Sequence, residues 1–290
     1  MPMPFTVAET GRSYARLSEA VAATDDRTAT ISIAPGTYRQ CTVQRAGRIT
    51  YRAKEPGTVI FDGVACEGKA ALVLRGQAAR VEGVTFSNLH VPDGNGAGIR
   101  LERGSLVVTH STFRDSEEGI LASSDPAASI TIDRSTFVRL GRCDRGLDCA
   151  HSIYVGHYRQ LTITNSRFLA GTGGHYVKSR ASRVTIAGNT FDDRGGHATN
   201  YMIDLPNGSS GIIGGNRMVQ GRDKDNHSAF IAIGPEGREH DSSTLRIENN
   251  MAGFEQGVLR TSTFVANWTR DHPRLSGNRL ASGIRPTDQR

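Results

Sequence analysis

The chain repeats a short pattern in which alternating apolar and polar residues lead to a small polar residue and then a large apolar one. The pattern closes eight times, at intervals of 23 to 33 residues. Repeats of this length are typical of solenoids, and strand-sized alternation without helical stretches between the repeats predicts a parallel β-helix. The closing residues are Phe86, Phe113, Phe137, Phe168, Phe191, Met218, Met251 and Leu280.

This pattern predicts an all-β protein, a single domain over residues 1–290 with about nine to ten coils between residues 28 and 280. Helical spacing of apolar residues within 13–23 predicts a short amino-terminal helix that caps the first coil. The polar residues 281–290 are expected to be a frayed end.

A second column of residues precedes the closing positions by two and is expected to be structural. Inward Ser and Asn side chains stack from coil to coil and hydrogen bond to turn backbone groups. Its predicted members are Ser111, Ser135, Ser166, Asn189, Asn216, Asn249 and Asn278. Longer intervals mark loop insertions at 140–151, 220–228 and 235–243, which we expect to wall a groove.

Composition narrows the choice of partners. Lys and Arg number 35 against 29 Asp and Glu, and this modest excess is spread along the chain without the basic blocks that nucleic acid requires. No apolar run is long enough to cross a membrane. This charge permits an acidic polysaccharide as the partner without requiring one. We expect that partner rather than a nucleic acid or a membrane, and we expect the protein to be a monomer.

The four cysteines form two candidate disulfides. Cys41 and Cys66 are 25 residues apart, which is one coil, and Cys143 and Cys149 would close a short loop. Four buried thiols are the alternative, and no Cys or His spacing suggests a metal site. Disulfides would indicate a periplasmic or secreted protein. The chain begins without a signal segment, so we expect that segment to have been removed.

Three coil segments, 150–157, 174–181 and 200–208, concentrate polar and aromatic residues. Strand alternation places Tyr154, Lys178 and Asp204 outward, and their distances from the closing residues predict that they form one column. Flanking columns are expected to hold His157, Arg180 and Asn207 on one side and His151, His175 and Tyr201 on the other. The alternative is a solvated strand face with a weak surface ion pair between Lys178 and Asp204.

Two further residues extend this patch. Arg100 lies at the same distance from its closing residue as Lys178, which places it in the same column three coils earlier. There it would either extend a row of basic side chains that binds the substrate chain or simply be solvated. Glu236 lies one coil beyond Asp204, as a turn residue or as a second carboxylate.

The blocks HSIYVG, GHYVKSRA and YMIDLPNG, flanked by VPDGNGAGIRLERG and IGPEG, resemble a bacterial family of right-handed parallel β-helix repeat proteins. The similarity covers about residues 28–255 and extends, at the level of the fold, to the pectate-lyase-like superfamily of lyases, epimerases and polygalacturonases. The polygalacturonases have an adjacent Asp–Asp pair in their active site, whereas the Asp–Asp pairs of this chain, Asp25–Asp26 and Asp192–Asp193, are expected in turns or at strand ends. The chain also lacks the aspartate cluster with which pectate lyases bind calcium, so no cofactor or metal is expected.

The predicted function is β-elimination of a uronate-containing polysaccharide. Arg180 would bind the substrate carboxylate, and Lys178 would be the base unless Asp204 holds it as a cation. In that case Tyr154 or His175 becomes the base, and His151 or Tyr201 would protonate the leaving oxygen. Asn207, His157, Arg100, Tyr201 and Glu236 are the expected substrate contacts. The alternatives are a glycoside hydrolase that uses Asp204 and Glu236, and a non-catalytic glycan-binding protein.

Overall fold

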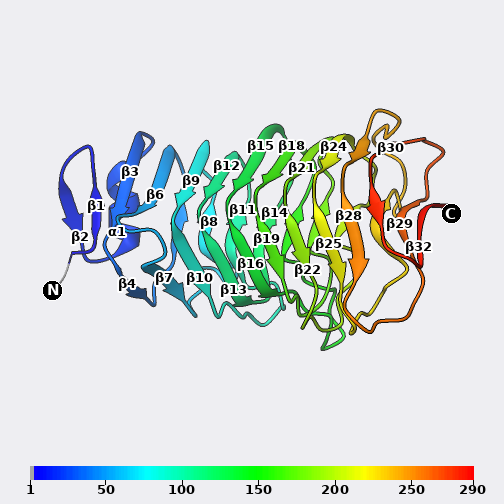
Figure 1. The fold of residues 1–290 in the computed structure, drawn as a ribbon. Helices are drawn as coiled ribbons and strands as arrows, with labels where there is room; N and C mark the ends of the chain where they lie inside the picture. The colour runs from blue at the N-terminus through cyan, green and yellow to red at the C-terminus, as the bar shows by residue number, and fades with distance from the viewer. Residues whose placement is uncertain (1–2) are drawn as a thin grey trace.

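The computed structural model describes residues 3–290 as an elongated solenoid of β-strands (Figure 1). Each full coil contributes one strand to each of three sheets, which contain 12, 10 and 10 strands. Strands of successive coils pair in parallel, so each sheet runs along the solenoid axis from the blue to the red end of Figure 1. The predicted all-β parallel β-helix is confirmed.

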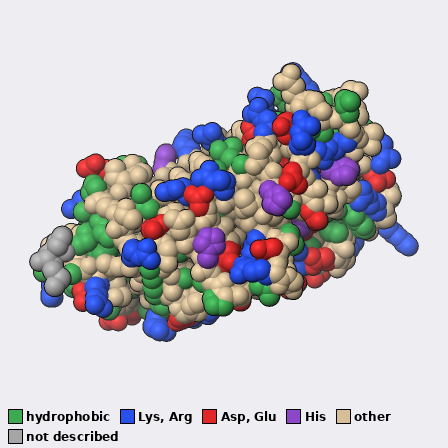
Figure 2. Space-filling model, turned by 90° about the horizontal axis from the view of Figure 1, so that it is seen from below, with side chains coloured by type: hydrophobic (Ala, Val, Ile, Leu, Met, Phe, Trp, Pro, Cys, Tyr) green, Lys and Arg blue, Asp and Glu red, His purple; other side chains and the backbone are tan. Residues whose placement is uncertain are grey.

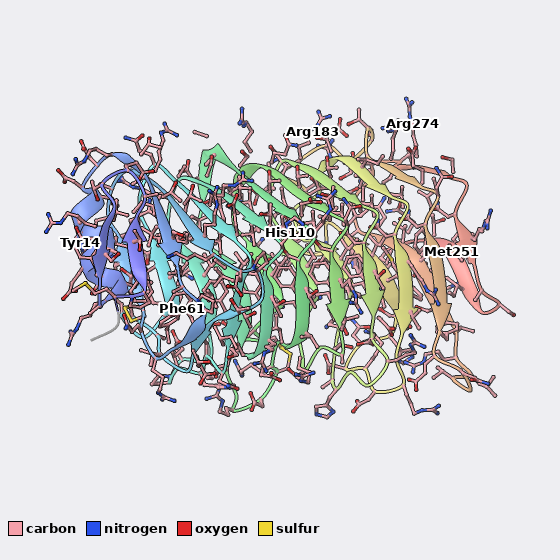
Figure 3. The ribbon with its side chains drawn as sticks, turned by 60° about the vertical axis from the view of Figure 1, so that its left-hand side comes forward. Tyr14, Phe61, His110, Arg183, Met251 and Arg274 are labelled. Carbon is pink, nitrogen blue, oxygen red and sulfur yellow. A yellow bond between two sulfur atoms is a disulfide. The ribbon has the colours of Figure 1, made fainter. Side chains whose placement is uncertain are left out.

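The first sheet forms the upper side of the solenoid in Figure 1. Its strands are β1 (Phe5–Val7), β2 (Arg12–Tyr14), β3 (Thr28–Ile33), β6 (Arg48–Ala53), β9 (Ala78–Glu82), β12 (Ser105–Thr109), β15 (Asp125–Asp133), β18 (Tyr158–Thr164), β21 (Arg183–Ala187), β24 (Ser210–Gly214), β27 (Arg246–Glu248) and β30 (Arg274–Ser276). Arg183 and Arg274 project from this side in Figure 3.

The second sheet faces the viewer of Figure 1, and the third lies behind it. The second comprises β4 (Gly36–Tyr38), β7 (Val59–Asp62), β10 (Val84–Ser87), β13 (Thr112–Ser116), β16 (Thr136–Leu140), β19 (Arg167–Leu169), β22 (Thr190–Asp192), β25 (Arg217–Gln220), β28 (Met251–Phe254) and β31 (Arg279–Leu280). The third comprises β5 (Thr42–Gln44), β8 (Ala70–Leu74), β11 (Ala97–Leu101), β14 (Glu118–Ala122), β17 (Ile153–Val155), β20 (Val177–Ser179), β23 (Ile203–Leu205), β26 (Ala229–Ile233), β29 (Ser262–Asn267) and β32 (Ile284–Gln289).

A stack of phenylalanine rings fills the core beneath the second sheet. Consecutive ring centroids are 4.7 to 5.9 Å apart, and the ring planes are nearly parallel. Large apolar residues at one position per coil therefore become a continuous buried column. The rings belong to Phe61, Phe86, Phe113, Phe137, Phe168 and Phe191.

The predicted stack is wrong at its carboxy-terminal end. Met218 pairs with Ala252, whereas Met251 lies at the outer surface and is 49% exposed. The coils at this end are filled instead by Phe230 and Phe264, which reach the core from the third sheet. The prediction took Met251, the large residue, as the inward position, whereas the inward residue is Ala252. The expected register of this strand was therefore wrong by one residue.

Ser and Asn side chains line the inside of the bend before the second sheet. Asn189 Oδ1 accepts the backbone N–H of Ser166 at 2.8 Å, and Asn216 Oδ1 accepts that of Asn189 at 2.9 Å. Asn250 continues the ladder, because its Oδ1 accepts the backbone N–H of Asn216 at 3.0 Å. The expected member Asn249 instead adopts a left-handed conformation in the bend.

Both ends of the solenoid differ from the predicted boundaries. The helix α1 (Leu17–Thr24) begins later than expected because β2 pairs with the antiparallel strand β1. It packs beside β1, β3 and β5 and buries Leu17 and Val21. The tail is not frayed, since β32 pairs with β29. No helix within residues 3–290 is long and apolar enough to cross a membrane.

Both candidate disulfides are present. Cys41–Cys66 links adjacent coils with a Cα–Cα distance of 5.4 Å, and Cys143–Cys149 closes the first insertion.

Replacing Asn216 with Ala should destabilise the solenoid by about 1–3 kcal/mol, since it leaves the buried backbone N–H of Asn189 without a partner. Urea unfolding followed by circular dichroism measures the loss. Gln256→Ala, which truncates an exposed amide in a turn, is the control. Equal unfolding midpoints for the two variants would show that the ladder is dispensable.

Candidate functional site

The outward face of the third sheet brings the predicted column together. The strand register pairs Tyr154 with Lys178 and Lys178 with Asp204. Arg100 pairs with Leu121, which pairs with Tyr154, so Arg100 occupies the same column three coils before Lys178. Neighbouring residues of these strands point inward and are fully buried, which fixes the outward direction of the column.

A second column lies at the bend that precedes the third sheet. The ring centroids of His151 and His175 are 4.9 Å apart, and those of His175 and Tyr201 are 5.4 Å apart. Trp268, from the carboxy-terminal part of the chain, packs against Tyr201. Glu118 opens β14 one coil before His151 and is 1% exposed.

Glu118 was missed in the sequence. The preceding Glu117–Glu118 pair was the available signal, but a register shift in β15 between Asp125 and Ser129 places Glu118 at a different count from its closing residue than His151.

Lys178 and Arg180 both donate to one carboxylate, that of Glu236. Lys178 Nζ lies 2.7 Å from Glu236 Oε1, and Arg180 Nη2 donates to the other oxygen. Arg180 Nε also donates to Tyr154 Oη at 3.0 Å, and its Nη1 donates to Asn207 Oδ1. Burial opposes ionisation of Glu236, but the hydrogen bonds from the two cations outweigh it and lower the pKa of this carboxyl.

Glu236 reaches the cations because residues 234–241, here called the latch loop, fold back over the strand face. Ala232 stands opposite Asp204 in the register, and the chain then turns at Gly234. The backbone N–H of Glu236 donates to Pro206 O at 3.0 Å. Farther along the loop, Glu239 Oε2 lies 2.9 Å from His157 Nε2. The insertion at 235–243 thus covers the predicted patch.

Asp204 and His175 form a buried pair beside Lys178. Asp204 Oδ2 is 3.4 Å from His175 Nε2 and 3.8 Å from Lys178 Nζ. Burial raises the pKa of Asp204 to about 7, against the attraction of Lys178. Burial also lowers the pKa of His175 well below its usual value, so the imidazole is neutral and this contact is not an ion pair.

His151 and Glu118 have a structural part in this column. His151 Nδ1 accepts the backbone N–H of His175 at 3.0 Å, which places the imidazole proton on Nε2. Burial lowers the pKa of His151 to about 3, so it remains neutral. Burial raises the pKa of Glu118, whose carboxyl lies at the backbone N–H of His151. Both residues therefore satisfy the backbone of the following coil.

A buried ion pair supports the bend that carries Tyr201. Lys224 Nζ lies 3.2 Å from Asp193 Oδ2 and donates to Asn200 O at 2.6 Å. Asp193 also accepts from Tyr176 Oη at 2.6 Å. The insertion at 220–228, expected to wall a groove, thus contributes a buried lysine to the scaffold.

The structure therefore gathers most of the predicted residues and leaves a few apart. Arg100 donates to Ser123 at 3.1 Å, away from the cation pair, and His157 contacts Ser124 and the far part of the latch loop. The gathered residues are Tyr154, His175, Lys178, Arg180, Asp204, Asn207 and Glu236. Their catalytic roles remain predictions.

The described part of the chain contains no group of three or more His, Cys, Asp or Glu side chains arranged to hold a metal ion. Figure 2 shows the underside of the solenoid, where basic, acidic and histidine side chains are interspersed.

The fold is shared with solved structures of low sequence identity. The pectin methylesterase from Aspergillus niger is 11% identical, with a TM-score of 0.59 over 100% of this chain and 91% of that one. ORF18 of Geobacillus virus E2 is 12% identical, with a TM-score of 0.57 over 93% of this chain and 55% of that one. No protein-family model and no curated protein matches the sequence.

These likenesses define the class of the fold, a right-handed parallel β-helix of about nine turns.

Replacing Asp204 with Asn should change how stability depends on pH. With its pKa raised to about 7, folded Asp204 keeps a proton that the unfolded chain releases near pH 4. This stabilising contribution is complete below pH 4 and is lost as the pH rises through about 7. The Asn variant does not lose this contribution. The difference between its free energy of unfolding and that of the wild type should therefore shift in favour of the variant as the pH rises from about 4 to about 8.

Denaturant unfolding across this pH range measures the difference, and Asp26→Asn at an exposed turn is the control. A difference between wild type and Asp204→Asn that stays constant with pH would contradict the raised pKa.

Proposed function

We propose that the protein acts on an acidic polysaccharide and cleaves it by β-elimination at the outward face of the third sheet. The observation that carries this proposal is the convergence of Lys178 and Arg180 on one carboxylate. A uronate carboxylate has the same chemistry as the Glu236 side chain. Two cations on that group withdraw charge from the sugar and make its C5 proton easier to remove.

The residues around the cation pair supply the remaining parts of the reaction. Lys178 contacts Glu236 and lies near Asp204, so it acts as a second carboxylate neutraliser rather than as the base. Tyr154 is the base, because the hydrogen bond from Arg180 holds its hydroxyl oxygen beside the cation pair. The C5 proton passes to Tyr154, the C4–O4 bond breaks, and a C4–C5 double bond forms. Tyr154 then returns the proton to O4.

His175 is less suited to be the base. Its side chain is only 12% exposed, and its Nε2 faces Asp204. The pectin methylesterase that shares the fold acts, by its name, on pectin, which fits a polysaccharide substrate but does not carry the proposal.

Glycoside hydrolysis is the second candidate, and the two carboxyls beside Lys178 favour it. The pKa of Asp204 is raised to about 7, whereas that of Glu236 is lowered. Opposite shifts in neighbouring carboxyls are the pattern of a general acid and its partner. Asp204 Oδ2 and Glu236 Oε1 lie 3.8 and 2.7 Å from Lys178 Nζ, so the two carboxyls are close enough to act on one glycosidic bond.

Incubation with a panel of polyuronates should produce an ultraviolet absorbance from unsaturated sugar ends. New reducing ends without this absorbance would replace elimination with hydrolysis. Asp204→Asn and Glu236→Gln should then each abolish their release. Polymer binding with neither product would identify a glycan-binding protein.

Arg180→Met and Lys178→Met should each lower turnover by at least about 100-fold, because each removes a charge that stabilises the transition state. Initial rates of absorbance increase, with polymer binding measured in parallel, test this expectation. Arg183→Met, on the first sheet in Figure 3, is the matched control for the loss of one positive charge. Unchanged turnover in either site variant would exclude the proposed carboxylate site.

A further inference from the structure

We propose that Lys178 and Arg180 form a carboxylate subsite that the protein occupies with its own Glu236, and that a substrate uronate must displace the latch loop to bind. The inference rests on the proposed function for the identity of the ligand. It adds that Glu236 competes with the substrate for the subsite. The site is therefore expected to bind polymeric uronic acids in preference to single ones.

Glu236 has the position of a ligand rather than of a buried structural partner. Its side chain is 43% exposed, whereas those of Lys178 and Arg180 are 14% and 17% exposed. The carboxylate therefore lies on the solvent side of two largely covered cations, where an incoming anion would bind. It comes from a turn 56 and 58 residues away in sequence, not from the strand face itself.

Backbone hydrogen bonds from Glu236 to Pro206 and from Glu239 to Asn207 anchor the latch loop, whereas its side chains make largely exposed contacts. The contact of Glu239 with His157 involves side chains that are 51% and 42% exposed, and such exposed contacts contribute little to stability. Arg238, which is 49% exposed, pairs with the buried carboxylate of Asp271. Gly237, with φ near 120°, directly follows Glu236, and an added Cβ there would meet no neighbouring atom. The position beside Glu236 is therefore uncrowded, which leaves room for the Glu236 side chain to turn away from the cations.

Hydrogen-bonding capacity beside the cation pair is unused. Within residues 3–290, Asp204 Oδ1 and His175 Nδ1 are buried and have no partner. Buried polar atoms without partners are uncommon in proteins, and they mark places where water or a ligand hydroxyl binds. Asp204 stands opposite Lys178 on the next strand, and His175 precedes Lys178 by three residues. A sugar whose carboxylate replaces Glu236 therefore brings hydroxyl groups close to the unmet atoms.

An internal competitor changes which ligands bind. Because Glu236 is tethered, its effective concentration at the cations is in the millimolar range or higher, and a dilute single uronic acid displaces it poorly. A polymer makes further contacts along the coils, and these offset the cost of displacing the loop. The subsite is therefore expected to favour chains.

Isothermal titration of wild type and Glu236→Gln with glucuronate, galacturonate and mannuronate tests the proposal. Glu236→Gln should bind at least one of these monosaccharides about tenfold more tightly than the wild type. Glu248→Gln, which removes one acidic charge from the first sheet, should bind as the wild type does. No gain for any sugar, or an equal gain in Glu248→Gln, would overturn the self-occupied subsite.

A second variant keeps the test independent of the folding of Glu236→Gln. Arg238→Met releases the loop from Asp271 while keeping Glu236, and it should tighten monosaccharide binding in the same direction by a smaller factor. Weaker or unchanged binding in this variant would count against a mobile latch. Product formation by the wild type is scored separately. Tighter binding without any product supports the subsite and rejects elimination, whereas product without tighter binding rejects only the self-occupied subsite.

Discussion

Parallel, in-register hydrogen bonding between successive coils is the constraint on which the rest of the structure depends. It holds equivalent residues of neighbouring coils about 4.8 Å apart, so every position of the repeat becomes a column. Inward columns become the phenylalanine stack and the Ser–Asn ladder. Outward columns place ionisable side chains side by side with the same spacing, and the candidate site is made in this way.

The same spacing explains the unusual electrostatics of the site. Four ionisable or aromatic side chains occupy one column at the bend, and packing against their neighbours removes them from water. Burial therefore keeps His151 and His175 neutral and raises the pKa of Glu118. Some of these side chains accept hydrogen bonds from backbone N–H groups of the next coil, as His151 does from His175. The column thus supports the solenoid as well as bordering the cation pair.

The sequence predicted what depends on periodicity and not what depends on loops. Tyr154, Lys178 and Asp204 were placed in one column because strand alternation and counting from Phe168, Phe191 and Met218 were sufficient.

Elsewhere counting failed for identifiable reasons. A large residue at Met251 masked the inward Ala252, and the register shift within β15 hid Glu118. The link between Glu236 and both cations could not be predicted, since it depends on the path of the latch loop rather than on the register. The ordered tail was missed because its pairing with β29 compensates for its polar composition.

The charge of the site depends on a single proton. Lys178 and Arg180 carry two positive charges, and Glu236 balances one of them. Asp204 balances the other only when it is ionised, and its pKa of about 7 places that change near neutral pH. Since His175 is neutral, it does not alter the count. A site whose net charge passes from positive to zero within this range attracts an anionic chain most strongly when Asp204 is protonated. Protonation of the buried Asp204 thereby raises the affinity of Lys178 and Arg180 for an anion.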